Sequence, residues 1–84
     1  MKLKPLASNM TELELNDTSI LFSYKTPVAA LIRNSDGKLE LFKTDYKWSV
    51  TTSRHINKYA AIVDKDIAGT KPQEFFDNLI SEVK

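Results

Sequence analysis

The apolar residues of this chain change their spacing near residue 50. Before that point they alternate with polar residues in short runs, which is the two-residue period of β-strands. After it they recur at Ile56, Tyr59, Ala60 and Val63, the spacing of one face of an α-helix. Strands followed by helices predict an α+β fold, in which the helices pack on an antiparallel sheet.

Five segments before this change are predicted as strands. They are residues 11–15, 18–24, 28–32, 38–43 and 46–50. Asn16-Asp17 is expected to form a hairpin turn, and Asn34–Gly37 a second turn in which Gly37 takes a positive φ. The run at 28–32 is apolar throughout, which is typical of a strand covered on both faces. We therefore expect an antiparallel meander of four to five strands.

The first predicted helix begins with Thr51 or Thr52 as its N-cap and contains the apolar stripe that ends at Val63. A polar connection, Asp64 to Gly69, follows it, and Gly69 is the expected helix-stopping residue.

The second predicted helix begins near Thr70, where Gln73 completes a capping box and Pro72 occupies the first turn. Its apolar stripe runs from Phe75 to Val83. Because neither helix can bury its stripe alone, we expect both to pack on one face of the sheet.

Length and composition limit the class of protein. The 84 residues suffice for one core, so residues 11–84 are expected to form a single small α+β domain, after a loosely ordered segment at residues 1–10. The chain has no cysteine, which favours a reducing, cytoplasmic location. No apolar run approaches the roughly 20 residues that a membrane helix requires, so no membrane association is expected.

The charges are unevenly distributed although the net charge is only +1. Residues 11–17 contain three acids and no base, whereas residues 43–58 contain four bases against Asp45 alone. Such asymmetry marks a binding face in some proteins and an ordinary solvated surface in others.

Three segments resemble a family of short uncharacterised proteins encoded by tailed bacteriophages. They are Ser23–Ala30, Trp48–Lys58 and Pro72–Asp77, and the likeness covers most of the chain after Asn9. Where that family often has a tryptophan after the lysine matching Lys58, this chain has Tyr59. The resemblance implies a phage origin and a place in the bacterial host cytoplasm, and it implies no activity.

The junction between the last predicted strand and the first helix is the most informative segment. A helix N-terminus has unpaired backbone N–H groups and a partial positive charge, and sequences usually place acids there. This one places hydroxyl and basic residues there instead, a combination suited to a bound phosphate or carboxylate. The predicted anion or nucleic-acid site consists of Lys47, Thr51, Thr52, Ser53, Arg54, His55 and Lys58.

A structural interpretation of the same residues stays open. In it Thr51 only caps the helix, Arg54 pairs with an acid of the sheet, and His55 is merely exposed. Aromatic residues among the bases can stack on nucleobases, but Trp48 and Tyr59 lie on apolar faces and are expected in the core.

Catalysis finds little support in the sequence. Ser53 and His55 are two residues apart on a helix and do not face each other, so they do not form a nucleophile–base pair. The chain has one histidine, no cysteine, and Gly37 and Gly69 as its only glycines. Metal-ligand spacings and a glycine-rich phosphate loop are therefore missing. We expect a non-enzymatic binding protein with no cofactor.

Two binding functions follow. In the first, the basic junction contacts phosphate groups of a nucleic acid or a nucleotide. In the second, the chain is an interaction module that modulates a host or phage protein, through a sheet edge or through the acidic hairpin around Glu12 and Glu14. Homodimerisation through an edge strand is compatible with both.

Overall fold

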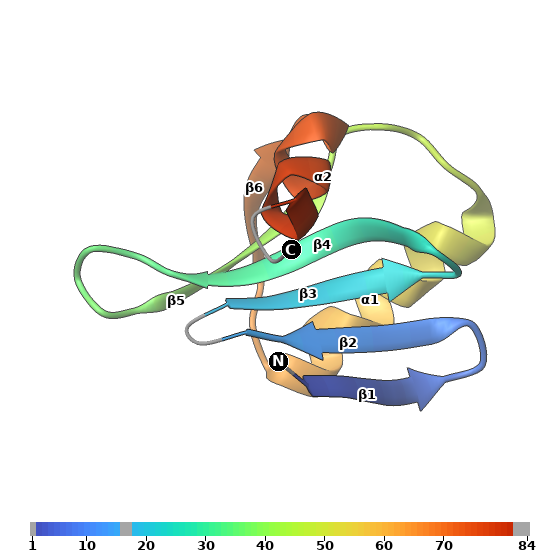
Figure 1. Ribbon diagram of the computed structural model, residues 1–84, viewed down its shortest axis with the longest axis horizontal. Coiled ribbons are helices and arrows are strands. Elements are labelled where there is room, and N and C mark those ends of the chain that lie inside the picture. The colour runs from blue at the N-terminus through green and yellow to red at the C-terminus, as the bar shows by residue number, and fades with distance from the viewer. Residues whose placement is uncertain (1, 16–17, 82–84) are drawn as a thin grey trace.

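The computed structural model describes residues 2–15 and 18–81 and contains one sheet and two helices (Figure 1). The elements are β1 (Lys2–Ala7), β2 (Met10–Glu14), β3 (Thr18–Ser23), β4 (Thr26–Arg33), β5 (Leu39–Thr44), α1 (Val50–Val63), β6 (Ile67–Lys71) and α2 (Gln73–Ser81). The predicted α+β class is confirmed, with six strands in place of four to five. The predicted turn Asn16-Asp17 and Val83 of the second stripe lie outside the described residues.

The strands are arranged in the sheet in their order along the chain, from β1 to β6. Neighbours from β1 to β5 are antiparallel, so the predicted meander is confirmed. Strand β6 pairs parallel with β5, and α1 connects the two. A parallel pair needs such a crossover, because its two strands run in the same direction.

The first strand, β1, occupies the segment that was expected to be loosely ordered. It pairs with β2 along most of its length, with Leu3 opposite Leu13 and Pro5 opposite Thr11. A proline lacks a backbone donor, and an edge strand tolerates it because one side of the strand has no partner. Because β1 and β2 are separated by a short turn, the two strands that pair are neighbours in the sequence.

No strand forms at residues 46–50, where the fifth predicted strand was expected. The place beside β5 belongs to β6, which pairs Leu41 with Ile67 and Lys43 with Thr70. Residues 45–49 instead form a loop that leads from β5 to α1. The expected polar connection after α1 thus contains a strand, and Gly69 lies inside it.

The two helices pack on opposite faces of the sheet, so the prediction of a single covered face is wrong. Tyr59 of α1 packs with the cluster that contains Leu21 and Leu41, whereas Phe76 of α2 packs with the cluster that contains Leu13 and Ile20. In Figure 1, α1 lies behind the sheet and α2 in front of it. The physical reason is β4, whose neighbouring residues face opposite sides and are nearly all apolar.

Both ends of α1 differ in detail from the expected caps. The N-cap is Ser49, whose Oγ accepts a hydrogen bond from the backbone N–H of Thr52 at 3.2 Å. Asp64 ends the helix in the left-handed conformation, with φ 55°, and Gly69 does not. The N–H groups of Asp64 and Lys65 reach the carbonyls of the last turn, as in a Schellman motif.

The predicted turn at Asn34–Gly37 forms, whereas the predicted start of the second helix differs. Gly37 has a φ of 82°, as expected, and Asn34 Oδ1 accepts hydrogen bonds from two backbone N–H groups of the same turn. Thr70 lies in β6, so the predicted capping box of the second helix does not form. The side chain of Gln73 is used elsewhere, as described below.

A buried carboxylate anchors α1 to the sheet. Glu12 of β2 is only 7% exposed, and its Oε2 accepts a hydrogen bond of 2.5 Å from the hydroxyl of Tyr59. Burial, reinforced by the hydrogen bond to Glu12, raises the pKa of Tyr59 well above its ordinary value. Since Glu12 is covered by α1, the acidic hairpin cannot offer it to a partner.

We expect Tyr59 to make folding stability fall at alkaline pH. The unfolded chain releases the phenolic proton from about pH 10, while the folded chain retains it, so the free energy of unfolding decreases by up to about 1.4 kcal/mol per pH unit. Urea denaturation between pH 9 and 11 measures this slope, and Tyr59→Phe should reduce it. An equal slope in Tyr59→Phe would contradict the prediction.

The same hydrogen bond predicts that two variants lose different amounts of folding stability at neutral pH. Tyr59→Phe leaves the buried Glu12 carboxylate without this donor and should cost about 1–3 kcal/mol. Glu12→Gln keeps an oxygen acceptor for the hydroxyl and should cost less. Urea denaturation at pH 7 compares the two variants.

Asp64→Gly is expected to stabilise the fold. Glycine adopts a positive φ without the steric cost of a Cβ atom, and the substitution also removes a negative charge from the helix C-terminus. The gain should be about 0.5–1 kcal/mol, which raises Tm by about 2–8 °C. Asp66→Gly is the matched control, because Asp66 has no positive φ, and it should leave Tm unchanged or lower it.

Candidate functional site

The predicted site lies where the chain leaves the sheet and enters α1. Strand β5 ends at Thr44, the loop 45–49 crosses to the helix, and α1 begins at Val50. A helix therefore starts where the prediction needs one, and its first turn contains no acidic residue. Arg54 is exposed, so it is not locked inward against a carboxylate of the sheet.

A groove of about 510 Å³ lies at this junction. Its walls are the end of β5, the loop, the first two turns of α1 and one residue of β6. The lining residues are Lys43, Thr44, Asp45, Tyr46, Lys47, Trp48, Ser49, Val50, Thr52, Ser53, Ile56, Asn57 and Thr70. Two lysines and one aspartate make this surface weakly positive.

The seven predicted site residues do not all lie at the groove. Lys47, Thr52 and Ser53 line the groove. Four others do not: Thr51, Arg54, His55 and Lys58. Successive helical residues are rotated by about 100°, so Ser53 and His55 point to opposite flanks of α1. Residues that are contiguous in sequence therefore do not converge on one anion.

Thr52 is a structural residue of the junction and contributes little to its surface. Its side chain is buried, and its hydroxyl lies 3.2 Å from the Ser23 hydroxyl of β3. The same hydroxyl lies 3.4 Å from Oγ of the N-cap Ser49. Thr52 thus ties the first turn of α1 to the sheet, which positions the exposed Ser53 beside it.

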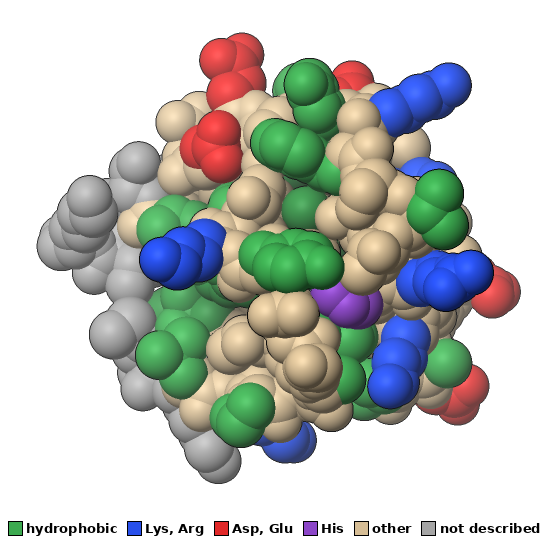
Figure 2. Space-filling model, turned by 90° about the vertical axis from the view of Figure 1, so that its right-hand side faces the viewer, with side chains coloured by type: hydrophobic (Ala, Val, Ile, Leu, Met, Phe, Trp, Pro, Cys, Tyr) green, Lys and Arg blue, Asp and Glu red, His purple; other side chains and the backbone are tan. Residues whose placement is uncertain are grey.

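His55 is half-buried on the other flank of α1. Its Nδ1 lies 2.7 Å from Ser23 Oγ, and its ring centroid lies 6.0 Å from that of Tyr24. Figure 2 shows this end of the molecule, with the histidine (purple) partly covered and Lys and Arg side chains (blue) around it, most of them to its right. Sequence spacing gave no sign of this pair, because Ser23 lies on another element.

The Ser23–His55 contact has the distance of a nucleophile and its base. Ser23 is only 2% exposed, however, and a substrate atom would have to approach within about 3 Å of its hydroxyl. The hydrogen bond therefore orients the imidazole and fastens α1 to the end of β3.

Two aromatic residues of the loop lie on the surface of the groove. Trp48 is 44% exposed and Tyr46 is 56% exposed, and their ring centroids are 4.4 Å apart. The expectation that Trp48 belongs to the core is wrong, because the strand on which it would face inward does not form. The same expectation for Tyr59 is confirmed, since this residue is fully buried.

Gln73, the first residue of α2, holds this loop in place. Its Oε1 accepts hydrogen bonds from Thr44 Oγ1 at 2.8 Å and from the Trp48 indole Nε1 at 3.1 Å. Its Nε2 donates to the Pro27 carbonyl of β4 at 2.7 Å. Sequence reasoning missed Gln73 and assigned it to a cap, since no local pattern connects it with Trp48.

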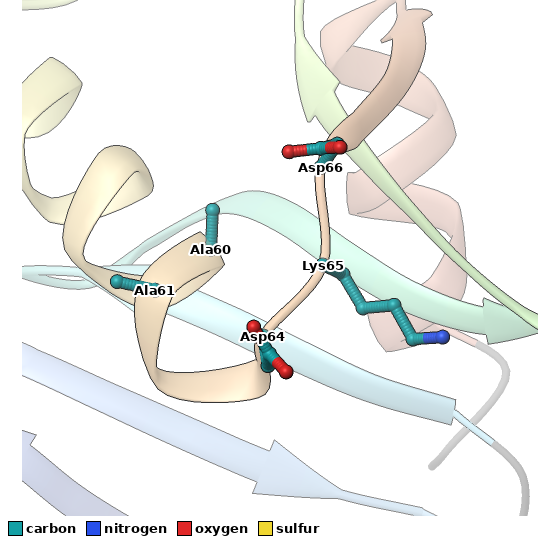
Figure 3. A pocket seen from close by; sticks show the side chains of 5 residues that line it. All are labelled: Ala60, Ala61, Asp64, Lys65 and Asp66. Carbon is teal, nitrogen blue, oxygen red and sulfur yellow. The ribbon is translucent and has the colours of Figure 1, made fainter.

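A second hollow, of about 290 Å³, lies at the C-terminal end of α1 (Figure 3). It is lined by Ala60, Ala61, Asp64, Lys65 and Asp66. Asp64 and Asp66 lie on either side of Lys65, and in Figure 3 their carboxylates do not converge. Among the described residues no group of three or more metal-ligating side chains forms.

A third hollow lies on the sheet face that carries α2. It is lined mainly by apolar side chains, with Leu3 66% exposed at its rim and Tyr24 54% exposed. Leu13 and Phe22 form its floor. This is the part of the sheet face nearest the edge strand β1.

The fold and the groove define a small α+β protein with a basic, aromatic surface at a strand-to-helix junction. The chain belongs to the DUF8033 family, a family of unknown function, whose family model matches residues 1–78. No curated protein and no solved structure matches the chain. Within the described part of the chain, neither helix is long and apolar enough to span a membrane.

Gln73→Ala should free the indole of Trp48 and destabilise the fold. The variant removes two hydrogen bonds to Oε1 and two from Nε2, to the Pro27 carbonyl and to Asp77 Oδ1, and their loss should cost about 1–3 kcal/mol. Time-resolved anisotropy of Trp48 should show faster local motion in this variant. Asn78→Ala, which removes an exposed amide from the same helix, is the control: it should leave the motion of Trp48 unchanged and should not destabilise the fold, because alanine is the better helix former.

Proposed function

We propose that this protein binds phosphate groups of a nucleic acid or a nucleotide at the groove between β5 and α1. The observation that carries the proposal is the composition of the groove: two lysines and two exposed aromatic rings beside a helix N-terminus without acids. Phosphates are attracted both by lysine ammonium groups and by the partial positive charge at the start of a helix.

The electrostatics favour a weak, salt-sensitive complex. Lys43 and Lys47 carry the positive charge of the groove, and Asp45 opposes it. Arg54 and Lys58 lie outside the groove on the exposed side of α1, where a strand longer than one nucleotide would reach them. Contacts of this kind position a phosphate backbone and do not read a base sequence.

The proposal is for a binding protein and not for an enzyme. Ser23 and His55 are the two residues whose contact most resembles a nucleophile and its base, and the burial of the Ser23 hydroxyl keeps a substrate from reaching it. We extend the proposal to a phage protein in the cytoplasm of its bacterial host, on the strength of the resemblance in the three segments described above.

A second candidate function rests on the third hollow. Exposed Leu3 and Tyr24 around an apolar floor are typical of a surface that binds another protein, here a host or phage protein or a second copy of the chain. The edge strand β1 borders this surface, and among the described residues no strand pairs with its outer side.

Binding of a labelled 12-nucleotide DNA strand, followed by fluorescence anisotropy, tests the first function. Affinity should fall steeply between 20 and 200 mM NaCl, because cations condensed on the phosphates are released on binding. Lys47→Ala should weaken binding about 3- to 10-fold and reduce the salt slope by about one. Lys65→Ala, an equal charge change at the other end of α1, is the control.

Equal losses in Lys47→Ala and Lys65→Ala would show general attraction to a charged protein and would contradict a site at the groove. Complete absence of binding at 20 mM NaCl would contradict the function. The second candidate predicts a partner that remains bound at 0.5 M NaCl and is released by Leu3→Glu.

A further inference from the structure

We infer that the Tyr46–Trp48 pair stacks on a nucleobase, so that the groove accepts single-stranded nucleic acid in preference to a duplex. This inference rests on the proposed function and deepens it, since it assigns the class of nucleic acid. It depends on the exposure of the two rings, on their fixed geometry and on the charges beside them.

The exposure of the pair is the first step. Two large aromatic side chains, each close to half exposed, lie side by side on a loop with planes 47° apart. Exposed apolar surface of this size costs hydration free energy, and a base is a flat apolar surface that would cover it. Every base presents a π-face, so this contact tolerates any base sequence.

The fixed position of the indole is the second step. The hydrogen bond from Trp48 Nε1 to Gln73 Oε1 occupies the one polar group of the ring. Gln73 is itself held by Thr44 and by the Pro27 carbonyl. The indole therefore has no donor to spare for reading a base edge, and it is held still before a ligand arrives, which lowers the entropic cost of stacking.

The neighbouring charges are the third step. Lys47 lies between the two aromatic residues in the sequence, and Lys43 lines the same groove. In a single strand each base is one sugar away from a phosphate, so one or two nucleotides would meet rings and ammonium groups together. A duplex keeps its bases stacked on one another and would offer the pair only its phosphates.

Aromatic rings of this kind also occur at protein interfaces, but lysines are depleted in the buried centres of those interfaces. Here Lys43 and Lys47 share the groove with the rings. The charges therefore favour a polyanion over a protein at this surface.

Trp48 is the only tryptophan of the chain, so its fluorescence reports on this site alone. We would titrate the protein with oligo(dT) of 12 nucleotides, with an abasic strand of the same length and charge, and with a 12-base-pair duplex. Oligo(dT) should quench the Trp48 emission and bind at least about 5-fold more tightly than the abasic strand, and the duplex should not quench it.

Variants separate stacking from charge. Measured with a labelled strand, Trp48→Ala should weaken oligo(dT) binding about 5- to 100-fold and leave the affinity for the abasic strand unchanged. Trp48→Phe retains a ring and should lose less. Ile62→Ala, which removes an exposed apolar side chain of α1 outside the groove, is the control and should bind as the native chain does.

The outcomes distinguish the two levels of the proposal. Equal affinity for oligo(dT) and the abasic strand, with Lys47→Ala still weakening both, would overturn stacking and leave phosphate binding intact. Binding of none of the three ligands would overturn the proposed function as well. A loss of abasic-strand binding in Trp48→Ala, or a duplex bound as tightly as the single strand, would also overturn stacking.

Discussion

The burial of β4 on both of its faces is the constraint from which the rest of this structure follows. Its side chains point alternately to the two sides of the sheet, and they are apolar on each side. Apolar groups on both faces are stable only if both faces are covered. α1 therefore covers one face and α2 the other, and the chain has to pass the edge of the sheet between them.

The connection that leads from β5 to α1 creates the candidate site. The loop 45–49 leaves the end of β5 and enters α1 without forming a strand, so Tyr46 and Trp48 remain on the surface. Although α2 packs on the opposite face, its first residue, Gln73, forms hydrogen bonds with Thr44, Trp48 and the Pro27 carbonyl. The orientation of the exposed indole thus depends on the packing of the helix that does not line the groove.

Buried polar groups fix α1 in the orientation that the groove requires. Glu12 binds the Tyr59 hydroxyl near the middle of the helix, and Ser23 contacts Thr52 and His55 near its start. Because these contacts set the rotation of the helix about its axis, they also decide which basic residues face the groove. Arg54 and Lys58 of α1 lie outside it, and the lysines that line it, Lys43 and Lys47, come from β5 and the loop.

The sequence by itself determined the local elements: the alternating strands of the meander, a first helix that begins near Thr51 and ends near Val63, the Gly37 turn and a helix start without acids. Its apolar run at 28–32 also indicated a strand covered on both faces. The prediction that both helices pack on one face was inconsistent with that indication. Only the tertiary structure decided the pairing of β6 with β5, the opposite placement of the helices, the exposure of Trp48 and the role of Gln73. The reason is physical: periodicity and capping act between residues a few positions apart, whereas parallel pairing, the choice of face and the Trp48–Gln73 hydrogen bond join residues that meet only when the chain folds.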